Sequence, residues 1–479
     1  MTKLKGYIKR EDRKRILLLC DDIRVHSGIA TMAREIVVNS AQTYNWFNIG
    51  AAIKHPDIGK ILDISDSINK QRNIPDSEVK ILPSNGYGDA GLIRQVLKDE
   101  KIDAVMIFTD PRYWIWLFEI EREIRSKIPI VWYNIWDDYP APLYNKDYYR
   151  SVDSLLAISK QTKNINELVL DEYAKDKVLR YVPHGIDEKI YYPINPEDKE
   201  FIKFKKETLK GNEYKFVAFF NSRNISRKHP HDLVLGYRLF CDMIGKEKAK
   251  ECALVMHTQV VDQHGTDLLA IKEALCDPSY VNLMFSTNRL TSQQLNCLYN
   301  LADVTVLPSS NEGWGLSLTE SMMAGTMIAA NVTGGMQDQM RFENDKGEWI
   351  DFDADFPSNH RGTYKKCGEW AIPIFPANVS LQGSPLTPYI FDDRCAPEEI
   401  ANALFKAYSM NIKERREKGL KGREWALSEE SGFTSERMTQ GIIDGIEETI
   451  DTFAPRKSFD FIKVKPKEPK YIKHQLSNY

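Results

Sequence analysis

Short apolar runs alternate with stretches of helical periodicity along most of the chain. In its first part, the runs that predict buried strands lie at residues 15–20, 103–108, 128–133 and 154–158. A polar or proline-marked break follows each run, and a helical pattern follows the break, as at residues 29–39. This alternation is typical of parallel sheets with crossover helices, so we predict a Rossmann-like unit here.

The same pattern restarts after a break at residues 192–196, which holds two prolines. Further strands are predicted at residues 215–220, 253–257, 281–285 and 304–307. Ligands of such sheets bind at the carboxyl ends of the strands. The predicted fold class is therefore α/β, with two Rossmann-like domains facing across a cleft that holds the site.

Domain boundaries follow from these breaks. We assign the first domain to residues 1–193 and the second to residues 194–430, with an irregular insertion at residues 341–394 that is rich in Pro, Gly and aromatic residues. Long insertions of this kind are often functional. Residues 431–455 are expected to form a helix that crosses back to the first domain, and residues 456–479 a basic tail that is extended or disordered.

Composition narrows the class of protein. The 479 residues include 65 Lys and Arg against 68 Asp and Glu, a net charge of −3, whereas a protein that coats nucleic acid usually has a basic excess. The seven cysteines form no Cys-x2-Cys pair, which argues against a zinc cluster or a disulfide framework. No signal-peptide core and no apolar run of the ~20 residues that span a membrane is found, so we expect a cytoplasmic protein.

The most informative stretch is PSSNEGWGLSLTESMMAG at residues 308–325. It places a glycine-containing turn after a predicted strand and starts a helix near Leu316. Glycines let backbone N–H groups approach a ligand closely, and the helix start adds partial positive charge, which together predict a phosphate site. Glu312 in the turn and Glu320 in the helix are placed to meet the hydroxyls of a sugar and of a ribose.

Two further segments add anion-binding groups. Arg223 and Lys228 lie five apart on the loop after the strand predicted at residues 215–220, and two cations there suit a diphosphate. Gly28 opens the first helix and allows close backbone approach at its N-terminus. No Gly-x-Gly-x-x-Gly is present, so a dinucleotide site is not favoured.

These residues resemble the signature of a known family. Glu312-Gly313-Trp314-Gly315-Leu316 followed by Glu320 is similar to the Glu-x7-Glu motif of the retaining GT-B glycosyltransferases of family four, the glycosyl transferases group 1. The pair Arg223 and Lys228 resembles that family's Arg-x4-Lys motif. Pro183 to Asp187 and the Gly334-Gly335 loop resemble two more of its motifs.

The resemblance implies metal-independent transfer from a nucleotide-sugar, which is a co-substrate, so no cofactor and no metal are expected. Glu312, Arg223 and Lys228 would carry catalysis by stabilising the leaving diphosphate and holding the sugar. That diphosphate would take the acceptor's proton on the same face, which explains retention. The donor-binding residues would be Gly28, Arg223, Lys228, Gly313, Trp314, Gly315, Leu316 and Glu320.

Other residues are candidates for sugar or acceptor contacts. His26 lies close to Gly28, and Asp110 stands where the family often has a histidine, which leaves the donor sugar open although a UDP-sugar is favoured. Asp137 and Asp138 lie in an aromatic run that is either an acceptor platform or a core strand with its loop. Adjacent acidic pairs such as these are expected in solvated loops rather than at metals.

The acceptor stays open at this point. We favour a glycan or a lipid-linked glycan, with a small soluble acceptor and a modified DNA base, as in viral DNA glycosylation, as alternatives. The basic tail and the aromatic run favour a polyanion or a membrane surface, whereas the acidic balance opposes both. A nucleotide-sugar epimerase of the same fold and a sugar-binding scaffold are the rival classes; the intact Arg223, Lys228, Glu312 and Glu320 argue against the scaffold.

Overall fold

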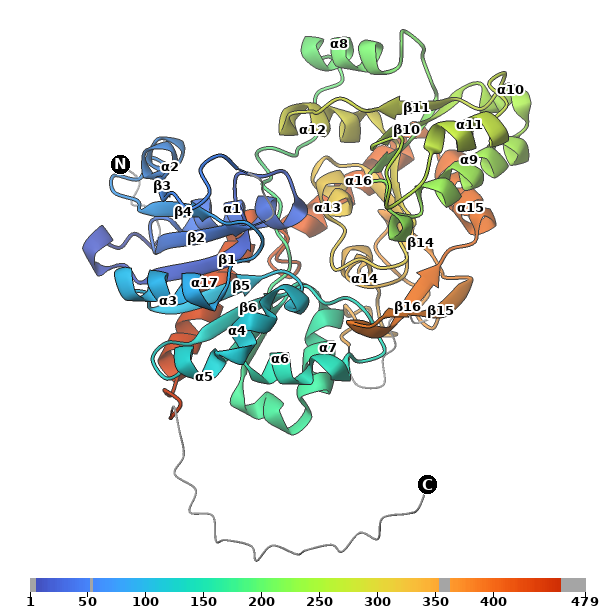
Figure 1. Cartoon of the computed structure of the whole chain (residues 1–479). Coiled ribbons are helices and arrows are strands. Elements are labelled where there is room, and N and C mark those ends of the chain that lie inside the picture. The colour runs from blue at the N-terminus through green and yellow to red at the C-terminus, as the bar shows by residue number, and fades with distance from the viewer. Residues whose placement is uncertain (1–5, 52–54, 353–361, 458–479) are drawn as a thin grey trace, which may run out of the picture.

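The computed structural model describes residues 6–51, 55–352 and 362–457, and it contains two separate parallel sheets (Figure 1). The N-terminal sheet has the order β3-β4-β2-β1-β5-β6-β7-β8, and only β3 runs antiparallel to its neighbour. Its central strands are buried along nearly their whole length, as in β1, because helices cover both faces. The bounds are β1 Arg15–Asp21, β2 Asn45–Ala51, β3 Leu62–Asp63, β4 Val79–Pro83, β5 Ala104–Phe108, β6 Ile130–Asn134, β7 Ser154–Ala157 and β8 Val178–Tyr181.

Helices connect these strands. The first, α1, begins after Ser27, whose side chain accepts a hydrogen bond from the Ala30 N–H and so caps the helix. The helices of this half are α1 Gly28–Ser40, α2 Ser65–Arg72, α3 Ala90–Asp99, α4 Ile115–Glu119, α5 Glu121–Ile124, α6 Lys146–Arg150 and α7 Lys160–Leu170, with the 3-10 turn η2 at Pro111–Trp114.

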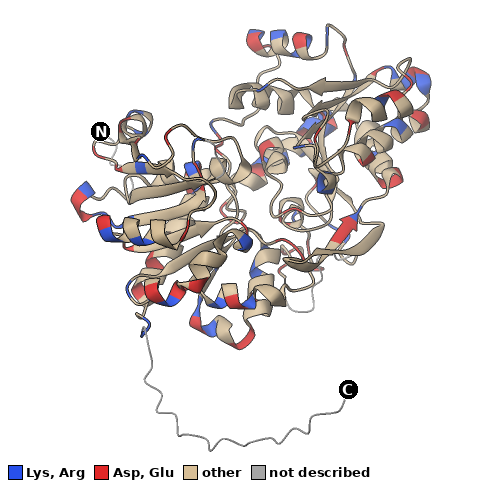
Figure 2. Cartoon of the chain, in the orientation of Figure 1, with Lys and Arg blue, Asp and Glu red and all other residues tan. Residues whose placement is uncertain are grey.

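The C-terminal sheet is wholly parallel, in the order β11-β10-β9-β12-β13-β14. Its strands are β9 Phe216–Asn221, β10 Cys252–His257, β11 Leu283–Ser286, β12 Val304–Leu307, β13 Met327–Asn331 and β14 Ala371–Ile374. Its helices are α8 Lys199–Thr208, α9 Pro230–Ile244, α10 Lys246–Ala249, α11 Leu268–Leu275, α12 Ser292–Leu301, α13 Leu316–Met323, α14 Met336–Met340, α15 Pro397–Ser409 and α16 Ile412–Leu427. Lys, Arg, Asp and Glu gather on these outer helices, whereas the strands are largely free of charge (Figure 2).

The expectation of an irregular insertion at residues 341–394 was wrong. The segment supplies β14, the sixth strand of the sheet, and then β15 Asn378–Ser384 and β16 Thr387–Arg394, which pair antiparallel as a hairpin. The hairpin is mostly exposed and β14 spans four residues, so neither produces a long apolar run. Residues 353–361 of this segment lie outside the described residues.

The chain crosses between the domains twice, and the two crossings lie side by side. Gly185 on the outward path lies so close to the return path that a Cβ there would be 2.1 Å from the Thr434 carbonyl oxygen. The return path leads into α17 Ser435–Thr452, which packs against α1 and the N-terminal sheet (Figure 1). The Tyr44 hydroxyl donates to Glu447 of α17 at 2.7 Å. The C-terminal segment thereby belongs to the core of the first domain.

Of the predicted basic tail, residues 458–479 lie outside the described residues, while the Arg456 N–H donates to the Arg125 carbonyl oxygen at 2.8 Å. Within the described ranges, no helix is both long and apolar enough to cross a membrane.

Because a methyl group at residue 185 would overlap the Thr434 backbone, Gly185→Ala is expected to separate the two crossings. We expect a loss of about 2 kcal/mol in the free energy of unfolding. Thermal or urea unfolding followed by circular dichroism measures this loss, and an unchanged midpoint would contradict the tight packing of the two crossings.

Candidate active site

The two domains meet at the loop between β12 and α13. A Cβ on Gly313 would lie 2.8 Å from the Ile158 side chain and 2.9 Å from the Ile135 carbonyl oxygen, both in the N-terminal domain. On the other side of the loop, a Cβ on Gly334 would lie 2.1 Å from the Glu312 carbonyl oxygen, and one on Gly335 2.2 Å from that of Gly313. Glycine is required at these positions because backbone fills the space on both sides of the loop.

Two helix N-termini face each other at this junction. Helix α13 begins after Gly315, whose φ of +86° lies in the left-handed region that favours glycine. A Cβ on Gly28, the first residue of α1, would lie 3.4 Å from the side chain of Leu316. Gly28 therefore lies beside the loop of residues 312–315, which we call the signature loop, and the partial positive charge of both helix ends points at the same region.

Trp314 holds the loop in the junction rather than presenting a side chain to solvent. It is buried, its indole N–H donates to the Thr319 hydroxyl at 3.0 Å, and its ring lies 4.9 Å from that of Phe433 and 6.3 Å from that of His184. Its backbone amide is the group that the resemblance assigns to the donor, and that assignment stays a prediction.

The carboxylate of Glu312 is the buried charge of the site. Lys228 forms an ion pair with it, the Arg227 guanidinium lies 3.5 Å away, and the Ser309 hydroxyl donates to it at 3.1 Å. Burial alone would raise the pKa of Glu312, but Lys228 and Arg227 outweigh burial and lower it. Burial, reinforced by Arg227, lowers the pKa of Lys228 to about 8 although Glu312 opposes the shift.

The two cations of the predicted Arg-x4-Lys pair are separated in the structure. Arg223 is exposed and pairs with Asp262 at 3.0 Å, whereas Lys228 pairs with Glu312. Arg227, which is not a member of the predicted pair, also lies at Glu312 and donates to the Asn311 carbonyl oxygen at 2.6 Å. The sequence interpretation missed Arg227, since an arginine next to a motif lysine carries no signal of its own. The role of Arg223 at the diphosphate stays a prediction.

Glu320 lies on α13 within a group of tyrosines. The Tyr299 hydroxyl donates to its carboxylate and itself accepts a hydrogen bond from the Asn221 side chain at 2.8 Å. Tyr191 is a second partner, yet burial raises the pKa of Glu320. A carboxylate held in this way has a fixed orientation, which suits the recognition of hydroxyl groups.

Asp137 and Asp138 do not lie in a solvated loop, as we expected of adjacent acids. They follow β6, are partly buried, and face the C-terminal domain, where the Asn311 side chain donates to Asp138. Burial raises the pKa of Asp137 to about 6, with Glu312 adding to the shift and Arg227 opposing it. Burial and the adjacent Asp137 raise the pKa of Asp138. The first domain therefore contributes two carboxylates to the Glu312 cluster.

Asp21-Asp22 and Asp392-Asp393 are two further pairs of adjacent acids, for which the same expectation of a solvated loop was wrong. Asp21 and Asp22 are buried, as is Asp393, which accepts a hydrogen bond from the Thr333 hydroxyl at 2.6 Å. Asp21 and Asp393 accept hydrogen bonds from residues far away along the chain, Tyr87 and Thr333, and a sequence pattern of two adjacent acids does not show such partners.

The remaining two candidates, Asp110 and His26, lie in loops of the N-terminal domain. Asp110 caps η2 and forms a two-point interaction with Arg112, so its carboxylate is already engaged. His26 is exposed just before α1, and partial burial, Arg289 and Arg34 lower its pKa. Arg289 belongs to the C-terminal domain, so His26 also faces the junction.

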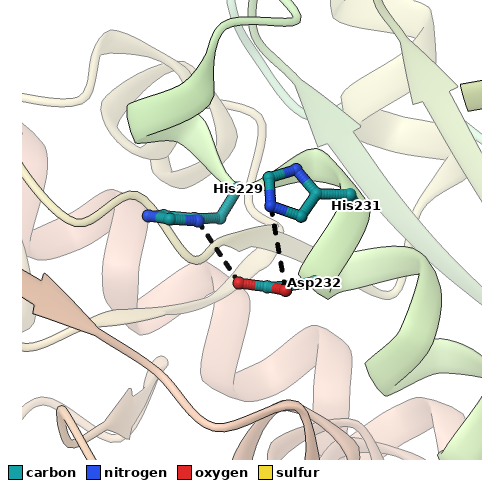
Figure 3. Close-up of side chains that lie close together, drawn as sticks. All are labelled: His229, His231 and Asp232. Carbon is teal, nitrogen blue, oxygen red and sulfur yellow. Dashed lines mark ion pairs between the residues drawn. The ribbon is translucent and has the colours of Figure 1, made fainter. Parts of the chain in front are cut away.

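Three side chains at the start of α9 have the chemistry of metal ligands. His229, His231 and Asp232 bring their ligand atoms within 4.8 Å of one another (Figure 3). However, a guanidinium nitrogen of Arg394 lies 3.2 Å from the Asp232 carboxylate and 3.5 Å from His229 Nδ1. A metal ion would have to displace this cation, so the group is explained as a polar bridge between α9 and β16. Metal independence of the reaction stays a prediction.

Part of the chain matches a known protein family, and one curated relative matches over a limited length. Residues 282–355 match the family described as glycosyl transferases group 1. Mannosylfructose-phosphate synthase of Agrobacterium fabrum (strain C58 / ATCC 33970) is 23% identical over 190 residues, and the matched part spans only 39% of this chain and 39% of that relative.

Solved structures agree along almost the whole chain. Anabaena Alr3699/HepE in complex with UDP and glucose superposes with a TM-score of 0.61 at 12% identity, covering 91% of this chain and 100% of that one. Sucrose-phosphate synthase (tll1590) from Thermosynechococcus elongatus gives 0.61 at 15%, covering 92% and 100%. At these identities the likeness concerns the fold, and it confirms the predicted GT-B arrangement of two Rossmann-like domains.

The lowered pKa of Lys228 predicts a pH dependence of nucleotide binding. Above pH 8 the lysine loses its charge, so affinity for a nucleoside diphosphate should fall about tenfold or more between pH 8 and 9.5. Lys228→Arg keeps its charge and should lose much less over the same range. Calorimetric titration of both proteins with the same nucleotide separates the lysine from ionisation of the ligand; equal losses would refute the assignment.

Proposed function

Because this chain belongs to the glycosyl transferases group 1 and has the GT-B fold, we propose that it transfers a sugar from a UDP-sugar to a hydroxyl group with retention of configuration and without a metal. The proposed acceptor is a glycan or a lipid-linked glycan. The observation that carries the proposal is the Lys228–Glu312 pair at the junction where the N-termini of α1 and α13 face each other.

The proposed chemistry follows from these charges. As the bond between the sugar and the diphosphate breaks, negative charge builds on the diphosphate, and Lys228 with the two helix ends is placed to offset it. On donor binding, Lys228 would exchange the Glu312 carboxylate for phosphate, and this releases Glu312 to accept hydrogen bonds from the sugar hydroxyls. The leaving diphosphate oxygen would then take the proton of the acceptor hydroxyl on the same face.

Glu320 is proposed to bind the ribose hydroxyls. It lies on α13, the helix that follows the Glu312 loop, and the Tyr299 hydroxyl donates to its carboxylate. The preference for a UDP-sugar is supported by two similar solved structures, whose bound molecules are UDP with glucose in one and UDP-2-fluoro glucose in the other.

The direct test is release of free nucleotide from UDP-, GDP- and ADP-sugars with EDTA present. We expect slow hydrolysis of the UDP-sugar that a suitable acceptor accelerates, and nuclear magnetic resonance of the product should show the anomeric configuration of the donor. Loss of the activity in EDTA, an inverted product, or preference for another nucleotide would each contradict the corresponding part of the proposal.

Glu320→Ala tests the nucleotide-binding role. Removing the carboxylate should raise the donor KM about tenfold or more, since hydrogen bonds to a charged group contribute about 1.5–3 kcal/mol. Glu247→Ala, a carboxylate that is 86% exposed on α10, is the control and should leave the donor KM unchanged. Steady-state kinetics measures both, and an unaltered donor KM in Glu320→Ala would remove Glu320 from the site.

A further inference from the structure

Arg227 joins the loop after β9 to the Glu312 loop through both its backbone and its side chain. It lies in the 3-10 turn η5 Ser226–Lys228, which comes directly before α9. Its carbonyl oxygen accepts a hydrogen bond from the Ser310 N–H at 2.9 Å, and its guanidinium donates to the Asn311 carbonyl oxygen at 2.6 Å. Both bonds end on backbone groups of the same loop, so the position of Arg227 does not depend on an ion pair.

Glu312 has two cations beside it, and they are held in different ways. Lys228 pairs with one carboxylate oxygen, and Arg227 lies 3.5 Å from the other. The lysine is a single charge on a flexible stem, so it can turn to another anion, whereas the arginine has the Asn311 carbonyl oxygen as a further partner. A phosphate that takes Lys228 therefore leaves Arg227 in place beside Glu312.

Several carboxylates gather at this junction. Asp137 and Asp138 approach from the loop after β6, and Arg227 acts on both of them as well as on Glu312. Asp393 adds a further negative charge near Asp138. A diphosphate would bring more negative charge and draw the lysine away, and a carboxylate removed from water without a cation is unstable in its charged form. A second cation that stays in place is therefore needed for Glu312 to remain ionised in the donor complex.

The pKa values at the junction depend on Arg227. Burial raises the pKa of Asp137 to about 6, and Arg227 opposes this shift more than any other charge. Burial, followed by Arg227, lowers the pKa of Lys228 to about 8. A neutral side chain at residue 227 would raise both pKa values, because a positive neighbour stabilises the charged carboxylate and destabilises the charged lysine.

We propose that Arg227 is a positioning residue, which keeps the Glu312 carboxylate charged and oriented while Lys228 binds the donor diphosphate. This proposal rests on the proposed function, in which Lys228 exchanges Glu312 for phosphate. Arg227 acts through Glu312, so it needs no contact of its own with the sugar or the diphosphate. The charge at residue 227 is therefore expected to matter more than the shape of the side chain.

Arg227→Gln tests the role of the charge in the full chain. The variant removes the charge and keeps an N–H group that can donate to the Asn311 carbonyl oxygen. We expect kcat/KM for donor hydrolysis at neutral pH to fall about tenfold or more, because Glu312 loses the cation that remains when the diphosphate engages Lys228. Steady-state release of UDP from the active UDP-sugar measures this loss, and an unchanged kcat/KM would overturn the proposal.

The pH profile separates a positioning role from a purely structural one. In Arg227→Gln, the alkaline loss of UDP affinity should move up by about one pH unit, since Lys228 would keep its proton to a higher pH. The acid limb of the hydrolysis rate should also move up, since Glu312 and Asp137 would take up protons at a higher pH. Calorimetric titration with UDP measures the first limb and nucleotide release the second. A residue that only supports the loop would lower the rate without moving either limb, and that result would overturn the proposal.

Two further variants complete the test. Arg227→Lys keeps the charge and should retain kcat/KM within about threefold, with both limbs close to those of the unmodified protein. A loss of about tenfold in this variant would overturn the proposal, even where Arg227→Gln does not fold. Arg122→Gln, on α5 with a side chain that is 76% exposed, is the control and should change neither quantity. Absence of both UDP binding and donor hydrolysis in the unmodified protein would instead refute the proposed function, which this proposal requires.

Discussion

The buried carboxylate of Glu312 constrains the arrangement of everything around it. A charge removed from water must be paired, and Lys228, Arg227 and the Ser309 hydroxyl supply that pairing from two separate loops of the C-terminal sheet. Because both loops start at the carboxyl ends of parallel strands, the parallel order of β9 and β12 is what brings them together. The cluster therefore depends on the sheet, and the proposed position of the donor depends on the cluster.

Close backbone packing transmits this constraint to the other domain. Gly313 lies against Ile135 and Ile158, so the Glu312 loop is in contact with the loops that follow β6 and β7. Asn311 completes the link by donating to Asp138. The hairpin β15–β16 adds a second connection, since the Phe391 N–H donates to the Tyr139 carbonyl oxygen at 2.7 Å. Carboxylates of the N-terminal domain and cations of the C-terminal domain thus lie close together across the junction.

The division of charge between the two sides is consistent with a transfer reaction. The C-terminal side presents cations and the N-terminus of α13, which suit a leaving diphosphate. The N-terminal side presents the N-terminus of α1 together with carboxylates and tyrosines, which suit hydroxyl groups. Their contact at Glu312, Lys228 and Asp137 is where the two substrates of such a reaction would meet. The outward path at Gly185 and the return path into α17 are packed backbone to backbone, and this packing fixes the position of one domain relative to the other.

The sequence by itself determined what depends on local pattern. Apolar runs identified β1, β5, β9 and β12, since a strand covered on both faces must be apolar throughout, and the glycine and glutamate spacing identified the signature loop. Tertiary structure decided which charges meet. Arg223 and Arg227 look alike in the sequence, but the path of the loop takes one to Asp262 and the other to Glu312. The burial of Asp137 and Asp138 and the hairpin β15–β16 were likewise hidden, because an acidic pair or an exposed strand acquires its role from residues that lie far away along the chain and become neighbours only on folding.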